Sequence, residues 1–203
     1  MTRSLRTAPL VAALMLALSA CSQQAAAPAT TPAAPAAAAV PADAALPAVD
    51  DAEAARMAEQ VREATRHAWQ GYMQYAKGHD DLKPISGQPR DWYPKPLLMS
   101  PVDALDTLLL LGLDKEANEA RELIVTQLSF DQDMDVQNFE VTIRLLGGLL
   151  SAYQMTNDER LLKLADDLGT RLSPVFDSPT GLPYTHVNLH TGKTSGKISN
   201  PAE

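Results

Sequence analysis

Residues 136–153, VQNFEVTIRLLGGLLSAY, form the stretch that decides the fold class. From position 143 to position 152 the only charged side chain is Arg144, so apolar residues fall on nearly every side of a helix. A surface helix keeps a polar face, and this stretch therefore predicts an inner helix that is buried on most sides. The next stretch, residues 158–172 (DERLLKLADDLGTRL), alternates charged residues with leucines and predicts an outer, amphipathic helix.

The same order of an apolar and an amphipathic helix occurs earlier in the chain. Residues 101–112 contain five leucines, and Ser100 followed by Pro101 predicts an N-cap and a first helical residue. Asp103 is expected as a helix-start acid and Asp106 as a hydrogen-bonded one. Asp114 is predicted to cap an amphipathic helix that ends near residue 128. Two such pairs indicate an all-α fold built from α/α repeats.

The segments around these pairs complete the expected folded part. Residues 51–76 have helical periodicity, and residues 80–96 contain so many prolines and glycines that they predict a loop. Residues 173–203 are loop-like, with a β-hairpin possible around residues 182–187. No long alternating run predicts a larger sheet.

The first twenty residues have the layout of a secretion signal. Arg3 and Arg6 precede an apolar run over positions 10–18, and small residues lead to Cys21, the only cysteine in the chain. This pattern is typical of a lipobox, so residues 1–20 are predicted to be a lipoprotein signal peptide and Cys21 the lipidated residue. An ordinary signal followed by a stray cysteine is the alternative. With Ser22 next, the protein is expected to be exported and lipid-anchored in the bacterial cell envelope, at the outer membrane.

Composition divides the remainder into a tether and a folded part. Residues 21–49 are almost entirely Ala and Pro, which predicts an extended tether, whereas residues 50–203 are long enough for one modest domain. Cleavage after residue 20 removes two of the 17 basic side chains and none of the 25 acidic ones, which leaves 15 basic against 25 acidic side chains. Nucleic acid is therefore excluded as a partner, because phosphate binding requires a basic surface.

Glu140 and Arg144 are the first candidates for chemistry, since the chain has no zinc-type spacing, phosphate loop or nucleophile elbow. They lie four residues apart and share one helix face. One interpretation is an ordinary ion pair that contributes about 0.2 to 0.5 kcal/mol. The other is a catalytic carboxyl group with a ligand-binding arginine. The second requires Arg144 to point mainly at ligand, because a direct pair would hold Glu140 in its charged form and weaken it as an acid.

Several motifs, in one order, resemble those of the class I α-1,2-mannosidases of glycoside hydrolase family 47. The resemblance covers residues 67–203 and is carried by these segments: His67-Ala68-Trp69, Gly78-His79-Asp80-Asp81-Leu82-Lys83-Pro84, Val102-Asp103-Ala104-Leu105-Asp106-Thr107-Leu108, Phe139-Glu140, Thr142-Ile143-Arg144, Leu146-Gly147-Gly148-Leu149-Leu150-Ser151-Ala152-Tyr153, Asp167-Leu168-Gly169 and Pro179-Thr180-Gly181-Leu182-Pro183-Tyr184. It implies an (α/α)7 barrel, of which this chain would form about the first two to three helix pairs.

The resemblance also implies an activity and its residues. It implies a calcium-dependent, inverting hydrolase that removes terminal α-1,2-linked mannose from mannose-containing oligosaccharides. Glu140 would be a catalytic acid, whereas Arg144 and Glu203 would bind the substrate. An inverting glycosidase needs a second carboxylate about 6.5 to 9.5 Å from the first. The family's remaining catalytic carboxylates and its calcium-binding threonine would follow Glu203, so no metal ligand is assigned here.

Two functions therefore remain open at this point. The first is an α-mannosidase whose printed chain is an incomplete catalytic domain that is inactive alone. The second is a non-catalytic, helical sugar-binding or scaffold lipoprotein. Four aromatic residues could stack on sugar rings, although aromatics at such junctions belong more often to the core. They are Trp69, Trp92, Tyr93 and Tyr184.

Overall fold

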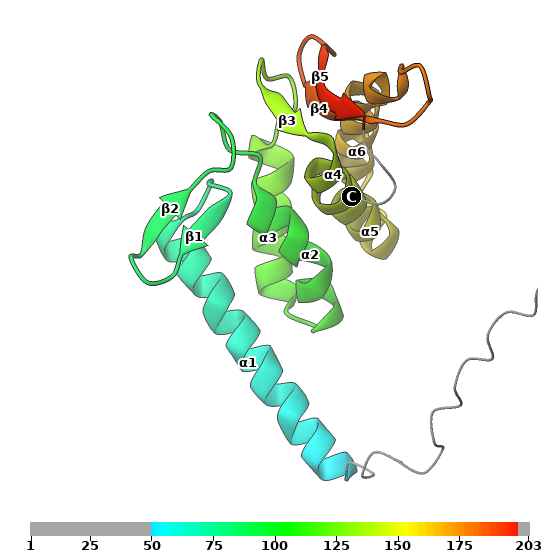
Figure 1. Ribbon diagram of the computed structural model, residues 1–203. Helices are drawn as coiled ribbons and strands as arrows, with labels where there is room; N and C mark the ends of the chain where they lie inside the picture. The colour runs from blue at the N-terminus through cyan, green and yellow to red at the C-terminus, as the bar shows by residue number, and fades with distance from the viewer. Residues whose placement is uncertain (1–49, 199–203) are drawn as a thin grey trace, which may run out of the picture. The chain divides into compact units, whose positions relative to one another are not determined.

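The computed structural model describes residues 50–198 (Figure 1). The signal peptide and tether predicted for residues 1–49, including Cys21, and the substrate-binding residue Glu203 lie outside the described residues. No helix within the described range is long and apolar enough to cross a membrane. The first element, α1 (Asp51–Tyr75), confirms the predicted first helix and is capped by Asp50, whose side chain accepts the backbone N–H of Ala52.

Two helix pairs form the body of the described chain. In the first pair α2 (Met99–Leu110) packs on α3 (Asp114–Gln127), and in the second α5 (Gly147–Thr156) packs on α6 (Glu159–Leu172). The apolar helices α2 and α5 also pack on each other, whereas α3 and α6 carry the charged faces. The mostly helical fold with α/α pairs that the sequence predicted is thus confirmed (Figure 1).

The core lies between the two apolar helices and their partners. Its fully buried side chains include Leu105 and Leu108 of α2, Leu149 of α5 and Leu168 of α6. The two inner helices approach closely at Gly148, where an added Cβ would lie 2.9 Å from Val102 Cγ1. Any larger residue at position 148 would push α5 away from α2, so this glycine sets the spacing of the inner layer.

Two small antiparallel sheets accompany the helices. The first is a hairpin of β1 (Asp81–Lys83) and β2 (Gln88–Arg90), which lies where the sequence predicted only a loop. The second has the order β3-β4-β5, with β3 (Asp135–Gln137), β4 (Tyr184–Asn188) and β5 (Thr194–Ile198). Strands of three residues leave no alternating run long enough to predict, whereas β4 overlaps residues 182–187, where the sequence allowed a hairpin, and has β5 as its partner.

The predicted helix at residues 136–153 is wrong in its start and its continuity. Residues 136 and 137 belong to β3, and the helix begins as α4 (Asn138–Val141), continues as a π-helix, η1 (Thr142–Leu146), and becomes α5. Near the chain's end, the 3-10 helix η2 (Ser173–Phe176) follows α6.

The predicted caps of the first pair are also wrong. The residue before α2 is Leu98, in the left-handed conformation, and α2 has no acid in its first turn. The Ser100 hydroxyl instead donates to Asp81 Oδ1 at 3.3 Å. Asp114 is the first residue of α3 and follows Leu113, which makes no side-chain cap. Neither helix therefore begins at a side-chain cap, and Ser100 makes a tertiary contact instead.

Candidate functional site

Glu140 on α4 and Arg144 on η1 form a direct ion pair. The Arg144 Nε donates to Glu140 Oε2 at 2.8 Å, as the spacing of four residues allows. The Arg144 Nη1 donates in addition to Asp103 Oδ2 of α2 at 2.9 Å. The guanidinium therefore bridges two carboxylates that are 37 positions apart in the sequence, and the pair is more than a local helix contact.

Charge and burial at this bridge shift the pKa of Asp103 in opposite directions. The hydrogen bonds that Arg144 donates to Asp103 and then to Glu140 raise the pKa of Arg144, so the guanidinium keeps its charge. Burial raises the pKa of Asp103, although the contact with Arg144 partly offsets that rise. One cation thus faces two acids, and the bridge carries a net negative charge when both acids are ionised.

The surroundings of Glu140 are open within the described part of the chain. The Glu140 side chain is 26% exposed, and its neighbours Phe139 and Ile143 are 62% and 51% exposed as residues. The sequence predicted burial on most sides of this helix, and that prediction is wrong for the face that carries Phe139 and Ile143. The exposed apolar side chains and the acid together form a surface that a sugar, which has both apolar and hydroxyl faces, could contact.

Asp106 plays the hydrogen-bonded part that the sequence predicted. Its Oδ2 accepts the Ser151 hydroxyl of α5 at 2.9 Å, and its Oδ1 lies 3.4 Å from the Thr107 hydroxyl. Asp103 and Asp106 therefore both connect α2 to the second apolar helix segment.

Trp92 lies beside the bridge. The Arg144 Cζ is 5.2 Å from the centroid of the Trp92 ring, within the range of a cation–π contact. The Trp92 indole N–H donates to Asp81 Oδ2 at 2.6 Å. The ring is thus held at one edge by a carboxylate and contacts the guanidinium that bridges Glu140 and Asp103.

Asp80 organises the segment that carries Trp92. It is fully buried, and it accepts the backbone N–H groups of Trp92 at 2.9 Å, Leu97 at 2.6 Å and Met99 at 3.2 Å. Burial raises the pKa of Asp80, and these three donors oppose the rise. One carboxylate therefore ties the chain after β2 to the beginning of α2.

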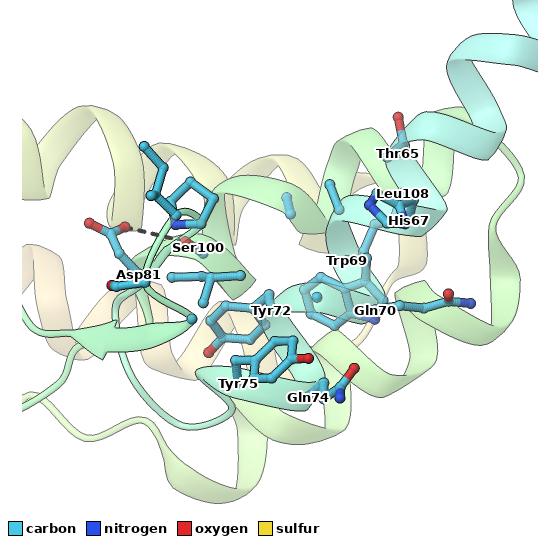
Figure 2. Close-up of a pocket in the computed structure, with 18 residues that line it drawn as sticks. Thr65, His67, Trp69, Gln70, Tyr72, Gln74, Tyr75, Asp81, Ser100 and Leu108 are labelled. Carbon is cyan, nitrogen blue, oxygen red and sulfur yellow. Dashed lines mark hydrogen bonds between the residues drawn. The ribbon is translucent and has the colours of Figure 1, made fainter.

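A pocket of about 1010 Å³ lies elsewhere, between α1, the β1–β2 turn and α2 (Figure 2). Trp69 and Tyr72 stack there with ring centroids 5.4 Å apart, and both are buried. Neither Glu140 nor Arg144 lines this pocket, so its size does not mark it as the site of chemistry. Trp69 belongs to the core, as the sequence favoured for the aromatic residues, and Trp92 is partly buried against that core.

Residues 50–198 contain no cluster of acidic, histidine or cysteine side chains of the kind that binds metal ions. No group of three or more His, Cys, Asp or Glu side chains in this range could hold a metal ion. Calcium requires about six to eight oxygen ligands. No residue in this range is assigned to the ion, and no step below is assigned to it.

The sequence identified Glu140 and Arg144 but missed two of their partners. Asp103 was expected as a helix-start acid, and Trp92 as an aromatic of the core or one that stacks on a sugar ring. The available signal for Asp103 was its spacing of three from Asp106 in a helix otherwise rich in leucine. No signal along the sequence brings Trp92 to Arg144, because that contact depends on the loop held by Asp80.

The comparisons with known proteins agree on one family. The family model described as glycosyl hydrolase family 47 matches residues 64–203. The chain is 49% identical over 126 residues to the human endoplasmic reticulum mannosyl-oligosaccharide 1,2-alpha-mannosidase, covering 62% of this chain and 18% of that protein. It is 44% identical over 134 residues to the mannosyl-oligosaccharide 1,2-alpha-mannosidase MNS1 of Arabidopsis thaliana, covering 66% of this chain and 24% of that protein.

A solved structure agrees with these relatives. The alpha-1,2-mannosidase from Trichoderma reesei superposes with a TM-score of 0.64 at 30% identity, covering 70% of this chain and 33% of that one. The chain spans about a fifth of the length of the two curated relatives above. Because the family model matches well over half of the chain, the chain belongs to glycosyl hydrolase family 47.

Proposed function

We propose that the protein is an inverting glycoside hydrolase that removes terminal α-1,2-linked mannose from mannose-containing oligosaccharides. The observation that carries this proposal is the Glu140–Arg144–Asp103 bridge, which lies inside the region matched by the family model. The relatives with 44% to 49% identity, whose names specify 1,2-alpha-mannosidases acting on mannosyl-oligosaccharides, support the substrate class.

In this proposal Glu140 is the proton donor to the leaving oxygen. Breaking a glycosidic bond places negative charge on that oxygen, and a carboxylic acid within hydrogen-bond reach neutralises it by transferring a proton. Arg144 must then relax its hold on Glu140 while substrate is bound. Asp103 provides for this, because it gives the guanidinium a second carboxylate partner at 2.9 Å.

Arg144 is the proposed contact to substrate hydroxyl groups. Its hydrogen bonds to Glu140 and Asp103 use Nε and Nη1. A guanidinium carries five N–H donors in a fixed plane, so the Nη2 donors remain for the oxygens of a sugar. The family resemblance supports Glu203 as a second substrate-binding residue. It also supports calcium as the cofactor of the reaction.

The test is the turnover of an α-1,2-mannobioside by the protein expressed from its complete reading frame. Glu140→Gln removes the transferable proton but little volume, so turnover should fall about 10²- to 10⁴-fold with an unchanged melting temperature. Asp167→Asn is the matched control, because Asp167 pairs with Arg171 at the same spacing of four residues and at 2.9 Å. Near-normal turnover of Glu140→Gln would remove Glu140 from the proposed chemistry and favour a non-catalytic, sugar-binding scaffold.

We further propose that lipidation of Cys21 anchors the exported protein in the bacterial cell envelope, at the outer membrane. The lipobox pattern before Cys21 supports this proposal. Cell fractionation of Cys21→Ser tests it, since a variant that stays in the membrane fraction without lipid contradicts it.

A further inference from the structure

Hydrogen bonds fix the backbone and the indole N–H of Trp92, and its ring contacts the guanidinium of Arg144. Its indole N–H donates to Asp81 Oδ2 at 2.6 Å, and its backbone N–H donates to Asp80 Oδ2 at 2.9 Å. Asp81 itself is fixed by the Ser100 hydroxyl at 3.3 Å and by the Nε of Arg90 at 3.0 Å. Because one carboxylate holds the backbone of Trp92 and another holds its indole N–H, the ring has a defined orientation.

The residue after Trp92 connects the same loop to the helix that carries Glu140. The Tyr93 hydroxyl accepts the backbone N–H of Gln137, the residue directly before α4, at 3.2 Å. The loop therefore contacts the beginning of α4 through Tyr93 and the guanidinium of η1 through Trp92. Movement of this loop would change both ends of the Glu140–Arg144 pair.

We propose that Trp92 is a positioning residue that, held by Asp81, fixes the plane of the Arg144 guanidinium so that it is shared between Glu140 and Asp103. This proposal rests on the proposed function, in which Glu140 donates a proton and Arg144 contacts substrate. Without the ring, Arg144 can rotate toward an end-on, two-pronged pair in which Nη1 and Nη2 donate to Glu140 and the Nε–H, which now donates to Glu140 Oε2, is released to water. That rotation would hold Glu140 in its charged form and turn the free N–H groups away from the substrate.

The chain contains a matched control for this arrangement. Trp69 also donates its indole N–H to a carboxylate, Glu119 Oε2, at 3.2 Å. Its ring stacks on Tyr72 instead of contacting a guanidinium that belongs to the candidate site. Replacing either tryptophan with Phe removes one indole and one hydrogen bond to an acid, so a general loss of packing would affect both variants.

The test uses the NMR signal of the Arg144 Nε–H in protein from the complete reading frame, with ¹⁵N-labelled arginine. Arg144→Lys identifies the signal by removing it. In Trp92→Phe the cation–π contact is weakened and the tie to Asp81 is lost, so the exchange of this proton with water should accelerate by up to about fivefold. Asp81→Ala should have the same effect, and Asp81→Asn should restore slow exchange because its amide oxygen still accepts the indole N–H. Trp69→Phe and Glu119→Gln should leave the signal unchanged.

Kinetics provides the second readout. Trp92→Phe should lower kcat on the mannobioside more than it raises KM, since the misplaced guanidinium acts on the proton donor, and Trp69→Phe should change neither constant. An unchanged Arg144 signal in Trp92→Phe would overturn the positioning role whatever the activity. If Trp92→Phe does not fold, the Asp81→Ala and Asp81→Asn pair decides the question by the same signal. A perturbed signal in a protein whose wild type releases no mannose would support the positioning role and contradict the proposed function.

Discussion

Single residues in this fold act through several partners at once. Arg144 joins Glu140 and Asp103 and lies over Trp92, so a change at any of them alters the other contacts. The sequence predicted the Glu140–Arg144 pair because both residues belong to one helix and the spacing alone places them together. It could not predict the contacts with Asp103 and Trp92, since these come from α2 and from a loop whose course depends on Asp80.

The carboxylate of Asp80 offers the sharpest prediction at the scale of a residue. Asp80→Asn keeps the volume but turns an amide N–H₂ toward a backbone N–H, that of Trp92 or those of Leu97 and Met99. Two donors then face each other in a buried place, which should lower the free energy of unfolding by about 1 to 3 kcal/mol. Urea unfolding measures this loss. Asp177→Asn, the same change at an exposed position, is the control and should be neutral.

The start of a helix and the type of its turns are harder to predict from this sequence than the presence of the helix. The sequence predicted one helix from residue 136, but β3 pairs with β4, about 50 positions further along, and takes the first two of those residues. In η1 the backbone hydrogen bonds join residues five apart, whereas those of an α-helix join residues four apart. The pattern of apolar residues over such a short segment cannot distinguish the two. The outer helix α6 was predicted well because both its cap and its amphipathic pattern are local.

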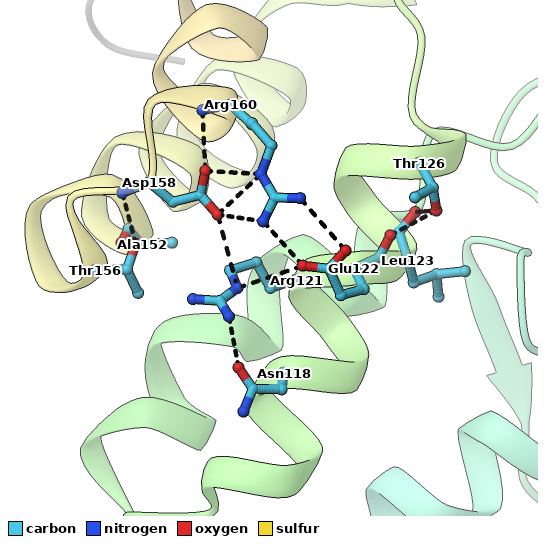
Figure 3. Close-up of polar contacts among 9 residues, drawn as sticks. All are labelled: Asn118, Arg121, Glu122, Leu123, Thr126, Ala152, Thr156, Asp158 and Arg160. Atoms are coloured by element: carbon cyan, nitrogen blue, oxygen red, sulfur yellow. Dashed lines mark hydrogen bonds and ion pairs between the residues drawn. The ribbon is translucent and has the colours of Figure 1, made fainter.

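The contact between the outer helices α3 and α6 depends on a polar network (Figure 3). Arg160 pairs with Asp158 at 2.7 Å and with Glu122 of α3 at 2.9 Å, and Arg121 lies 3.7 Å from Asp158. Arg160 lowers the pKa of Asp158 to about 2, chiefly through their hydrogen bond. Asp158 also accepts the backbone N–H of Arg160 at 3.0 Å and so caps α6.

This network predicts a specific dependence of stability on pH. The pKa of Asp158 is lower in the folded state than its value of about 3.9 in an unfolded chain, so the ionised carboxylate stabilises the fold above pH ~4. That contribution should be lost as the pH falls from about 4 to about 2. Asp158→Asn keeps the cap but not the charge, and should cost about 1 kcal/mol at pH 7 and much less at pH 2, where part of the wild-type Asp158 is already protonated.

The difference in urea unfolding free energy between wild type and Asp158→Asn isolates this titration from that of the other acids. Asp166→Asn on the exposed side of the same helix serves as the control and should show no such pH-dependent difference. A difference between wild type and Asp158→Asn that stays constant from pH 5 to pH 2 would contradict the assigned ion pairs.

At the scale of the whole molecule, the fold class was predicted mainly from the order of apolar and amphipathic helices. Alternating burial fixes which helix of a pair faces inward, and the helix pairs follow from it. What the sequence could not show is how much of the inner layer the described residues leave uncovered. Leu110 of α2 is 76% exposed, Phe139 of α4 is 62% exposed and Ile143 of η1 is 51% exposed. The element η1 packs against both α2 and α4.

These exposed side chains predict how a polypeptide of residues 50–203 behaves alone. A few hundred Å² of apolar surface left in water corresponds to several kcal/mol at about 25 cal/mol per Å², and monomeric proteins rarely expose more. We therefore expect this polypeptide to self-associate at micromolar concentration, measured by analytical ultracentrifugation. The double variant Leu110→Lys and Ile143→Lys should shift it toward monomer, because charges on both helices oppose the contact. Ile85→Lys, at a fully exposed position in the β1–β2 turn, should not. A wild-type polypeptide that stays monomeric would show that the uncovered face needs no further partner.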